Sequence, residues 1–309
     1  MKGNWSLGTE FVLLGFQVSP ETEVLLFWVF SLLYTFSLLA NGMIFVLICL
    51  DQRLHTPMYY FLSHLAIIDI SYASNNVPQM LANLVTQNKA ISFVPCIIQT
   101  FLYLGLAVTE SLILVAMSYD RYVAICHPLQ YTVIMSWTVC TILATMSWSC
   151  AFFLALIHVL LLQRLPFCRS REVNHFFCEL LSILKLACGD IWLNKVAIFT
   201  ASILILVGPL CLVLVSYTHI LWAILKIQSG EGRRKAFSTC SSHLCVVGLF
   251  FGIAMVVYMV PDSSQEGEKN KILFLFYSLF NPMLNPLIYS LRNAQVKVAL
   301  YRALQVRSR

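Results

Sequence analysis

Ionisable side chains interrupt two long apolar stretches of this chain. Asp69 lies in one stretch, and Glu110 and Arg121 lie in or at the end of another. Glu110 and Arg121 are 11 residues apart, which at about 100° per residue is roughly three helical turns plus 20°, so the two side chains share a face. Tyr103 and Ala107 extend that face in the other direction. The spacing predicts one stripe that runs from an aromatic and apolar end, past a carboxylate, to a cation.

Two carboxylates at a similar depth in an apolar environment restrict each other's ionisation. An ionised Glu110 facing lipid would cost several kcal/mol, so we expect it to face inward and to meet Asp69 there. Like charges that close cannot both stay ionised in a dry site, so either one carboxyl holds a proton or a cation lies between them. Asn41, Asn281 and Asn285 would supply further oxygen ligands for a hard cation such as sodium. A water-filled polar network without a specific ion is the alternative, and a proton relay is a third.

The composition excludes a water-soluble domain. Of the 309 residues, 59% are hydrophobic and 11% are charged, whereas a soluble domain carries roughly 25% charged residues. Most of the chain must therefore face lipid. The net charge of +6 comes largely from basic residues beside apolar segments, at 233–235 and in the C-terminal tail, which favours a lipid surface over nucleic acid as the anionic partner.

Seven stretches are candidates for transmembrane helices, since a span needs about 20 mostly apolar residues. They cover about 24–50, 57–84, 94–120, 138–161, 195–226, 236–260 and 270–291. The second and the seventh are weak by hydropathy, because they carry Asp, Asn and Pro; such residues are tolerated where a polar face looks into a helix bundle. The predicted fold is an all-α membrane protein, a seven-transmembrane helix bundle that forms a single domain over 1–309.

Two smaller features complete the predicted architecture. Residues 293–305 place Val296, Leu300 and Leu304 at helical spacing with basic residues between them, which predicts a short amphipathic helix on the membrane surface. Prolines within the predicted spans should break the local hydrogen-bond ladder and kink the helix. These prolines are Pro209, Pro282 and Pro286.

The basic residues and the cysteines predict the orientation. With the N-terminus (1–23) outside and the tail (292–309) inside, 11 Lys or Arg fall inside and 9 outside, together the 20 of the chain, a small positive-inside bias. Seven of the 11 cysteines lie in or beside apolar runs and are expected to be packing residues. The other four would lie on the outer, oxidising side, where disulfides form: Cys96, Cys168, Cys178 and Cys188. Asn4 begins a glycosylation sequon in the outer N-terminus.

No pattern in the chain indicates an enzyme. The sequence has no phosphate-binding loop, no zinc-ligand helix and no nucleophile elbow. It also has no inverted repeat of the kind many transporters carry. A receptor, a channel and a transporter are the classes left to compare.

Five motifs stand in order on the predicted spans. They are LHTPMYYFLSHLAIIDI (54–70), MSYDRYVAICHPLQY (117–131), SY (216–217), KAFSTCSSHLCVVGLFFG (235–252) and NPMLNPLIYSLRN (281–293). Together they resemble the odorant receptor family of rhodopsin-like G-protein-coupled receptors, over nearly the whole chain. The resemblance implies a plasma-membrane receptor that binds a small-molecule odorant and activates the stimulatory olfactory G protein, which raises cyclic AMP.

The resemblance also assigns roles to individual residues. Asp120 would hold Arg121 at rest, and Arg121 would meet the G protein on activation, with Tyr122, Tyr217 and Tyr289 beside it. A polar or sodium site in the middle of the membrane would include Asp69, Glu110 and Asn285. The implied disulfides are Cys96–Cys178 and Cys168–Cys188.

The implied ligand pocket lies high in the bundle. By position its lining would be Tyr103, Leu104, Ala107, Val108, Ala201, Ile205, Phe251, Met255 and Tyr258. These side chains are almost all apolar or aromatic, so a ligand would bind mainly by burial of apolar area, and we expect neutral ligands. One departure from the family is Phe251, where a Tyr is common; the missing hydroxyl removes a hydrogen bond to the ligand or to the third helix.

Two alternatives remain open at this stage. His175, Cys178 and Glu179 in the long outer connector are suitable ligand types for copper or zinc, but a Cys178 held in a disulfide would not be a ligand, so no confident metal site is predicted. The same receptor fold would also serve as a chemosensor for an endogenous metabolite outside the nose, and a channel or transporter is the alternative from a different class.

Overall fold

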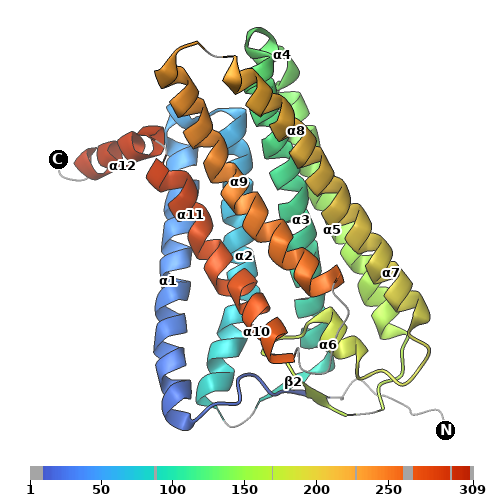
Figure 1. Ribbon diagram of the computed structural model, residues 1–309. Helices are drawn as coiled ribbons and strands as arrows, with labels where there is room; N and C mark the ends of the chain where they lie inside the picture. Colours follow the sequence, from blue (N-terminus) through green and yellow to red (C-terminus); the bar gives the residue numbers. More distant parts are fainter. Residues whose placement is uncertain are drawn as a thin grey trace.

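A bundle of seven rods makes up the molecule (Figure 1). The computed structural model describes residues 10–86, 89–168, 170–226, 228–259, 267–292 and 294–306. The rods are α1 (Pro20–Leu50), α2 (Pro57–Val85), α3 (Phe93–Cys126), α5 (Trp137–Gln163), α7 with η3 and α8 (Trp192–Ser202, Ile203–Val207, Gly208–Leu225), α9 (Gly230–Met259), and α10 with η4 and α11 (Gly267–Leu275, Phe276–Phe280, Asn281–Arg292). Each agrees with one predicted span to within a few residues, apart from α3, which ends six residues after its span, and α9, which begins six residues before its span.

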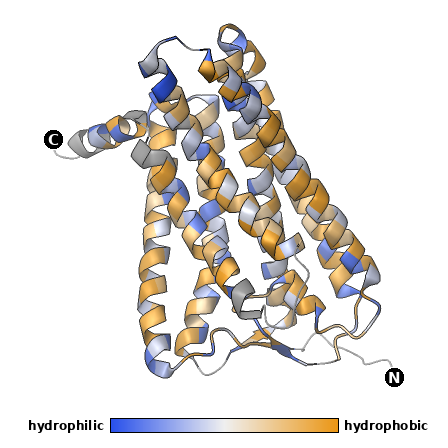
Figure 2. Cartoon of the chain, viewed as in Figure 1, coloured by the Kyte–Doolittle hydropathy of each residue, from blue (hydrophilic) through white to orange (hydrophobic). Residues whose placement is uncertain are grey.

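The outside of the bundle is apolar, as Figure 2 shows for the face in view. Large hydrophobic side chains such as Leu32, Phe153 and Leu204 are 71%, 66% and 65% exposed, which in a soluble protein would form an aggregation-prone patch. Six of the described helices are long and apolar enough to cross a membrane, and the predicted seventh span is among them. The exception is α2, whose polar residues are buried between its neighbours α1 and α3.

Two rods contain a π-helical turn directly before a proline. The π-turn η3 precedes Gly208-Pro209, and η4 precedes Asn281-Pro282. A proline has no N–H to donate to the preceding turn, so the backbone has to rearrange there. The expected interruption of the helical hydrogen bonds is observed at Pro209 and Pro282, whereas α11 continues as an α-helix through Pro286.

The carbonyl groups that two prolines leave without a donor receive side-chain donors from other helices. Ile205 lies four residues before Pro209, and its carbonyl oxygen accepts a hydrogen bond from the Ser111 hydroxyl of α3 at 2.8 Å. Pro282 lies four residues before Pro286, and its carbonyl accepts from the Asn41 amide of α1 at 2.7 Å. In a membrane interior an unpaired carbonyl costs several kcal/mol. The two bonds satisfy these carbonyls and join α3 to η3 and α1 to α11.

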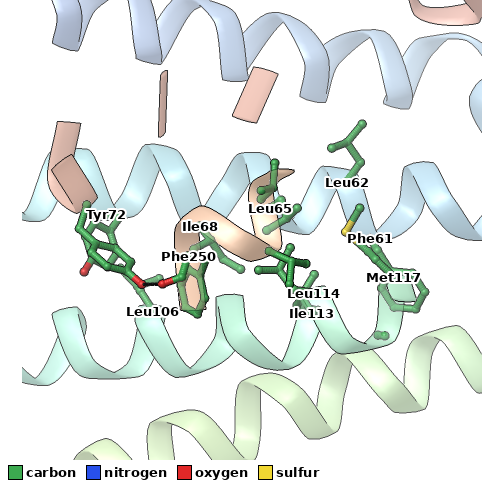
Figure 3. Close-up of a cluster of buried hydrophobic side chains, with 14 of the residues drawn as sticks. Phe61, Leu62, Leu65, Ile68, Tyr72, Leu106, Ile113, Leu114, Met117 and Phe250 are labelled. Carbon is green, nitrogen blue, oxygen red and sulfur yellow. Dashed lines mark hydrogen bonds between the residues drawn. The ribbon is translucent and has the colours of Figure 1, made fainter. Parts of the chain in front are cut away.

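Helix α3 is the central element and contacts α2, α5, α8 and α9. Figure 3 shows its apolar face against α2: the fully buried residues include Phe61, Leu65, Ile68, Ile113, Leu114 and Met117. On the opposite side Gly105 allows α5 to approach closely, because a Cβ there would lie 2.8 Å from the ring of Phe152. These contacts fix the depth and rotation of the stripe that carries Tyr103, Glu110 and Arg121.

The end of the bundle that carries the N-terminus is closed by a small sheet that the sequence did not predict. Strand β1 (Glu10–Leu13) pairs antiparallel with β2 (Ala90–Ser92) and parallel with β3 (Glu172–Val173). Phe11 and Leu13 are 1% and 0% exposed, and the burial of these two alternating side chains holds the strand in register. The short helix α6 (Leu180–Leu184) lies beside it. Asn4 lies outside the described residues.

Two disulfides anchor the connector that carries β3 and α6. Cys96 at the start of α3 is bonded to Cys178, and Cys168 is bonded to Cys188 within the connector. Both pairings are those that the family resemblance implied. They hold the connector directly above the helix bundle.

At the opposite end the chain runs into α12 (Ala294–Val306), which projects sideways from the bundle (Figure 1). Val296 and Ala299 are buried against the bundle, and Lys297 is exposed. The described part of this helix is therefore amphipathic, in agreement with the predicted interfacial helix.

Candidate functional site

A cavity lies between the helices towards the sheet-covered end. Its volume is about 80 Å³; since one water needs about 10–15 Å³ by this measure, the cavity has room for a molecule of several heavy atoms. The lining comes from α3, α5, the α6 connector, α7, η3, α9 and η4. It consists of Tyr103, Leu104, Ala107, Val108, Leu154, Ala155, His158, Leu180, Ile198, Ala201, Ser202, Ile205, Leu206, Phe250, Ala254, Tyr258 and Tyr277.

Seven of the nine predicted pocket residues line this cavity, and two do not. The exceptions are Phe251 and Met255 of α9, whose places are taken by Phe250 and Ala254. Phe250, Ala254 and Tyr258 are spaced by four residues and share one helical face. For Phe251 and Met255 the predicted face was therefore displaced by one residue, about 100°, because hydropathy alone does not distinguish neighbouring faces of a helix that is apolar all round. Tyr258 lines the cavity as predicted. The hydroxyl of the family's common tyrosine is missing at Phe251, but this does not change the polarity of the cavity, since Phe251 is buried in the core and does not line it.

Sequence reasoning missed the contribution of α5 and of the outer connector. Leu154, Ala155 and His158 line the cavity from α5, and Leu180 lines it from α6. On α5 the one available signal was His158, the single histidine in a span without Lys, Arg, Asp or Glu. The implied Cys96–Cys178 disulfide tied the connector to the start of α3, but only the tertiary packing places Leu180 at the cavity.

The mid-membrane carboxylates come together through α11. The Asn281 amide donates to a Glu110 oxygen at 2.8 Å, and the Asn285 amide donates to both Asp69 oxygens at 3.1 and 3.0 Å. Asn281 and Asn285 are one helical turn apart, so the two carboxylates are held on the same side of α11. The predicted network therefore forms from four of its five residues, while Asn41 binds Ser37 and the Pro282 carbonyl instead.

The inner end of α3 differs from the predicted arrangement. Asp120 accepts a hydrogen bond from the Tyr131 hydroxyl at 2.7 Å, and among the described side chains no ion pair joins it to Arg121 within 4.0 Å. The reason is geometric: adjacent residues of a helix point about 100° apart and do not face each other. Burial, together with Asp120, raises the pKa of Tyr131, which keeps its hydroxyl protonated as the donor.

The other predicted switch residues also have different partners. The Tyr217 hydroxyl is 2.7 Å from Nδ1 of His243, and the Tyr122 hydroxyl is 3.1 Å from His127. Nε of Arg121 is buried without a hydrogen-bond partner in the described structure. The side chain of Tyr289 lies outside the described residues. Arg121 is thus a partly buried side chain whose Nε donor is unsatisfied in the described structure, at the end of α3 opposite the sheet.

The sequence and the fold were compared with known proteins. The family model of olfactory receptors matches residues 30–307. Human olfactory receptor 2A2 is 72% identical over 305 residues, which cover 99% of this chain and 96% of the relative. Mouse olfactory receptor 2A7 is 61% identical, with 99% and 98% covered. The chain belongs to the olfactory receptor family. The structure is similar to the crystal structure of squid rhodopsin, with a TM-score of 0.72, 17% identity, and 94% and 87% of the two chains covered.

Membership of the olfactory receptor family, together with the rhodopsin-like fold, determines the broad function. This olfactory receptor is a multi-pass membrane protein that responds to odorants through a G protein, and it is not an enzyme. The cavity and the end of α3 that carries Asp120 lie at opposite ends of the same bundle, with the carboxylate network between them.

The three-stranded sheet and the connector with α6 form a lid over one end of the bundle. This lid buries several polar groups. The Lys271 ammonium, on a fully buried side chain, donates to the Gly15 carbonyl at 2.9 Å, and Gly15 has a φ of 61°, a conformation that favours glycine. His175 packs against the rings of Phe177 and Phe274 at 4.6 and 4.9 Å between ring centres. Burial, with Lys271 and Lys185, lowers the pKa of His175 to about 3.

The groups weighed as copper or zinc ligands have other roles in this lid. Cys178 is in the disulfide with Cys96. Both oxygens of Glu179 accept backbone N–H groups, from Leu181 at 2.9 Å and Ser182 at 2.7 Å, which caps α6. Burial nevertheless raises the pKa of Glu179. The His175–Glu179 segment is therefore explained by its structural contacts.

Proposed function

We propose that this olfactory receptor binds small, neutral, hydrophobic volatile molecules in the cavity beside α3 and, when occupied, activates the stimulatory olfactory G protein at the plasma membrane, which raises cyclic AMP. The observation that carries the proposal is the lining: among the described residues it contains no Lys, Arg, Asp or Glu. An ionised ligand would be buried without a counter-charge, at a large cost in free energy. A neutral ligand gains about 25 cal/mol for each Å² of apolar surface it buries.

The inner end supplies a surface for the G protein. A groove between the inner ends of α8 and α9 is lined by Ile224, Leu225 and Phe237, with Arg233 and Arg234 at its edge. An apolar groove with a basic rim suits an amphipathic helix that carries acidic residues. Arg121 lies in the same end of the bundle, so a change in its environment is adjacent to the docked partner.

The orientation that this proposal requires places the N-terminus outside. Both disulfides lie at the end of the bundle that carries β1, and disulfides persist in an oxidising compartment. The amphipathic helix α12 lies at the opposite end, where an anionic lipid surface would attract its basic residues.

The carboxylate network fits the expected sodium ion in its donor set. Asp69 and Glu110 supply carboxylate oxygens, and Oδ1 of Asn285 is buried without a partner in the described structure. Oxygen ligands with net negative charge are what a hard cation selects. Sodium at this site would supply a positive charge between the two acids, and it remains a proposal.

The test is a cyclic-AMP assay of cells that express the receptor, against a broad panel of neutral odorants. We expect Arg121→Ala to abolish the response while surface expression stays normal, because the cation at the inner end is lost. Leu160→Ala is the matched control: Leu160 is 56% exposed on the lipid face of α5, so its response should match the wild type.

Two outcomes would contradict the proposal. The first is dose-dependent activation by short carboxylic acids with none by neutral odorants, which would require a cationic partner in the site. The second is an odorant-evoked conductance in reconstituted membranes that contain only the receptor, which would indicate a channel.

A further inference from the structure

Several polar side chains that line the cavity donate their protons to other groups of the protein. Nδ1 of His158 lies 2.8 Å from the Leu154 carbonyl oxygen. A carbonyl oxygen only accepts, so the proton must be on Nδ1 of His158. In the neutral imidazole the other ring nitrogen, Nε2, is then a lone-pair acceptor.

The hydroxyl groups in the lining follow the same pattern. Ser202 on α7 donates its proton to the Ile198 carbonyl at 2.8 Å. Tyr277 donates to the Phe250 carbonyl, and Tyr258 donates towards the Tyr103 hydroxyl at 3.5 Å. Each of these donors is used, whereas the oxygen lone pairs of Ser202 and Tyr277 remain. The lining therefore offers a ligand mostly acceptors.

We infer that this cavity selects odorants that carry a hydrogen-bond donor, alcohols and phenols, over isomers that only accept, such as ethers and ketones, and that Nε2 of His158 is the main recognition atom. The inference rests on the proposed function, because it names the ligand class of the same cavity. His158 is 7% exposed and lines the cavity from α5. The surrounding lining residues Leu154, Ala155 and Ile198 are apolar and offer no competing donor.

The selection follows from the cost of an unmet acceptor. An alcohol in the cavity donates its own O–H to Nε2, whereas an ether that excludes water from this atom leaves Nε2 unpaired. A donating hydroxyl such as Tyr103 would serve the oxygen of an alcohol and of an ether equally, so it does not change the comparison. We expect about a tenfold difference in the half-maximal concentration.

The experiment compares constitutional isomers. n-Hexanol and methyl pentyl ether have the same atoms and nearly the same volume, and they differ in the presence of an O–H donor. Cyclic AMP is measured for both on the full-length receptor, then on His158→Phe, which keeps a ring but removes the lone pair, and on His158→Gln, whose amide oxygen restores an acceptor. Leu160→Ala on the lipid face of α5 is the matched control.

The inference predicts a hexanol preference of about tenfold in the wild type and in Leu160→Ala, a ratio near one in His158→Phe, and a recovered preference in His158→Gln. A wild-type ratio near one or below it overturns the inference but leaves the proposed function intact, since both isomers then activate. A ratio that survives His158→Phe removes His158 from the recognition. Failure of both isomers and of their longer homologues, while other neutral odorants activate, overturns the inference alone; failure of the whole neutral panel overturns the proposed function as well.

Discussion

Asp120 and Arg121 are neighbours in the chain, but they have different environments. Asp120 is 1% exposed and bonded to Tyr131, whereas Arg121 points about 100° away into the bundle, where Nε is buried without a partner in the described structure. A hydrogen bond to a charged group contributes about 1.5–3 kcal/mol. Tyr131 therefore competes with Arg121 for the carboxylate.

Replacement of Tyr131 tests this competition. In Tyr131→Phe the Asp120 carboxylate loses its donor, and Arg121 is the nearest remaining cation, so the pair should tighten and restrain Arg121. We expect lower basal cyclic AMP and a weaker odorant response at equal surface expression. The matched control is Tyr119→Phe, since Tyr119 is a 40%-exposed tyrosine on α3, next to Asp120 in the chain. A higher basal signal in Tyr131→Phe would show that Tyr131 itself restrains the receptor.

At the scale of elements, the helices are joined where prolines interrupt them. Pro209 and Pro286 each leave a carbonyl without its usual donor, and Ser111 and Asn41 from other helices supply one. The carbonyl that a proline leaves unpaired in one helix thus accepts a hydrogen bond from a side chain of a second helix. Because Ser111 follows Glu110 directly on α3, the same turn of α3 bonds to η3 on one side and to α11 on the other.

A double-mutant cycle tests whether the serine is needed because of the proline. Ser111→Ala leaves the Ile205 carbonyl unpaired and should cost about 1–3 kcal/mol of stability. In a Pro209→Ala background the restored N–H bonds that carbonyl, so the added cost of Ser111→Ala should fall by at least half. The measurement is the thermal unfolding midpoint of purified receptor in detergent. Equal costs in both backgrounds would mean that Ser111 acts independently of Pro209.

At the scale of the whole molecule, the lid couples the N-terminal segment to the bundle. Gly15 bonds through its carbonyl to Lys271 of α10 at 2.9 Å and through its N–H to the His175 carbonyl at 3.1 Å. His175 is buried among aromatic rings, and its Nε2 has no partner in the described structure. A neutral imidazole is tolerated there, and an imidazolium beside the Lys271 cation is not.

The stability of the lid should therefore depend on pH. The pKa of His175 is about 3 in the folded protein and about 6.5 when unfolded, so its contribution is complete above about pH 6.5 and is lost as the pH falls, by about 1.4 kcal/mol per pH unit. Between pH 7.5 and pH 5 the wild type should lose about 2 kcal/mol more stability than His175→Gln. Thermal unfolding of both proteins across this range measures the difference. Glu179 is present in both proteins, so its titration cancels, and parallel curves would refute the prediction.

The sequence by itself determined the seven spans, the interfacial helix and most residues of the site. Long apolar runs in a chain with 11% charged residues leave lipid as the only solvent for the surface, and a helix is the way a single segment satisfies its backbone there. The period of the helix then placed Tyr103, Ala107 and Glu110 on one face. These conclusions need only local spacing, which a sequence contains.

The tertiary structure decided the contacts that depend on rotation and on distant segments. The face of α9 at the cavity, with Phe250 instead of Phe251, is set by packing against Tyr277. The partner of Asp120 is Tyr131, which a tight turn after α3 brings back. The strand β1 finds its partners about 80 and 160 residues away. Hydropathy contains no information on any of these, because an apolar helix has no preferred face and a short strand has no partner until the whole chain has folded.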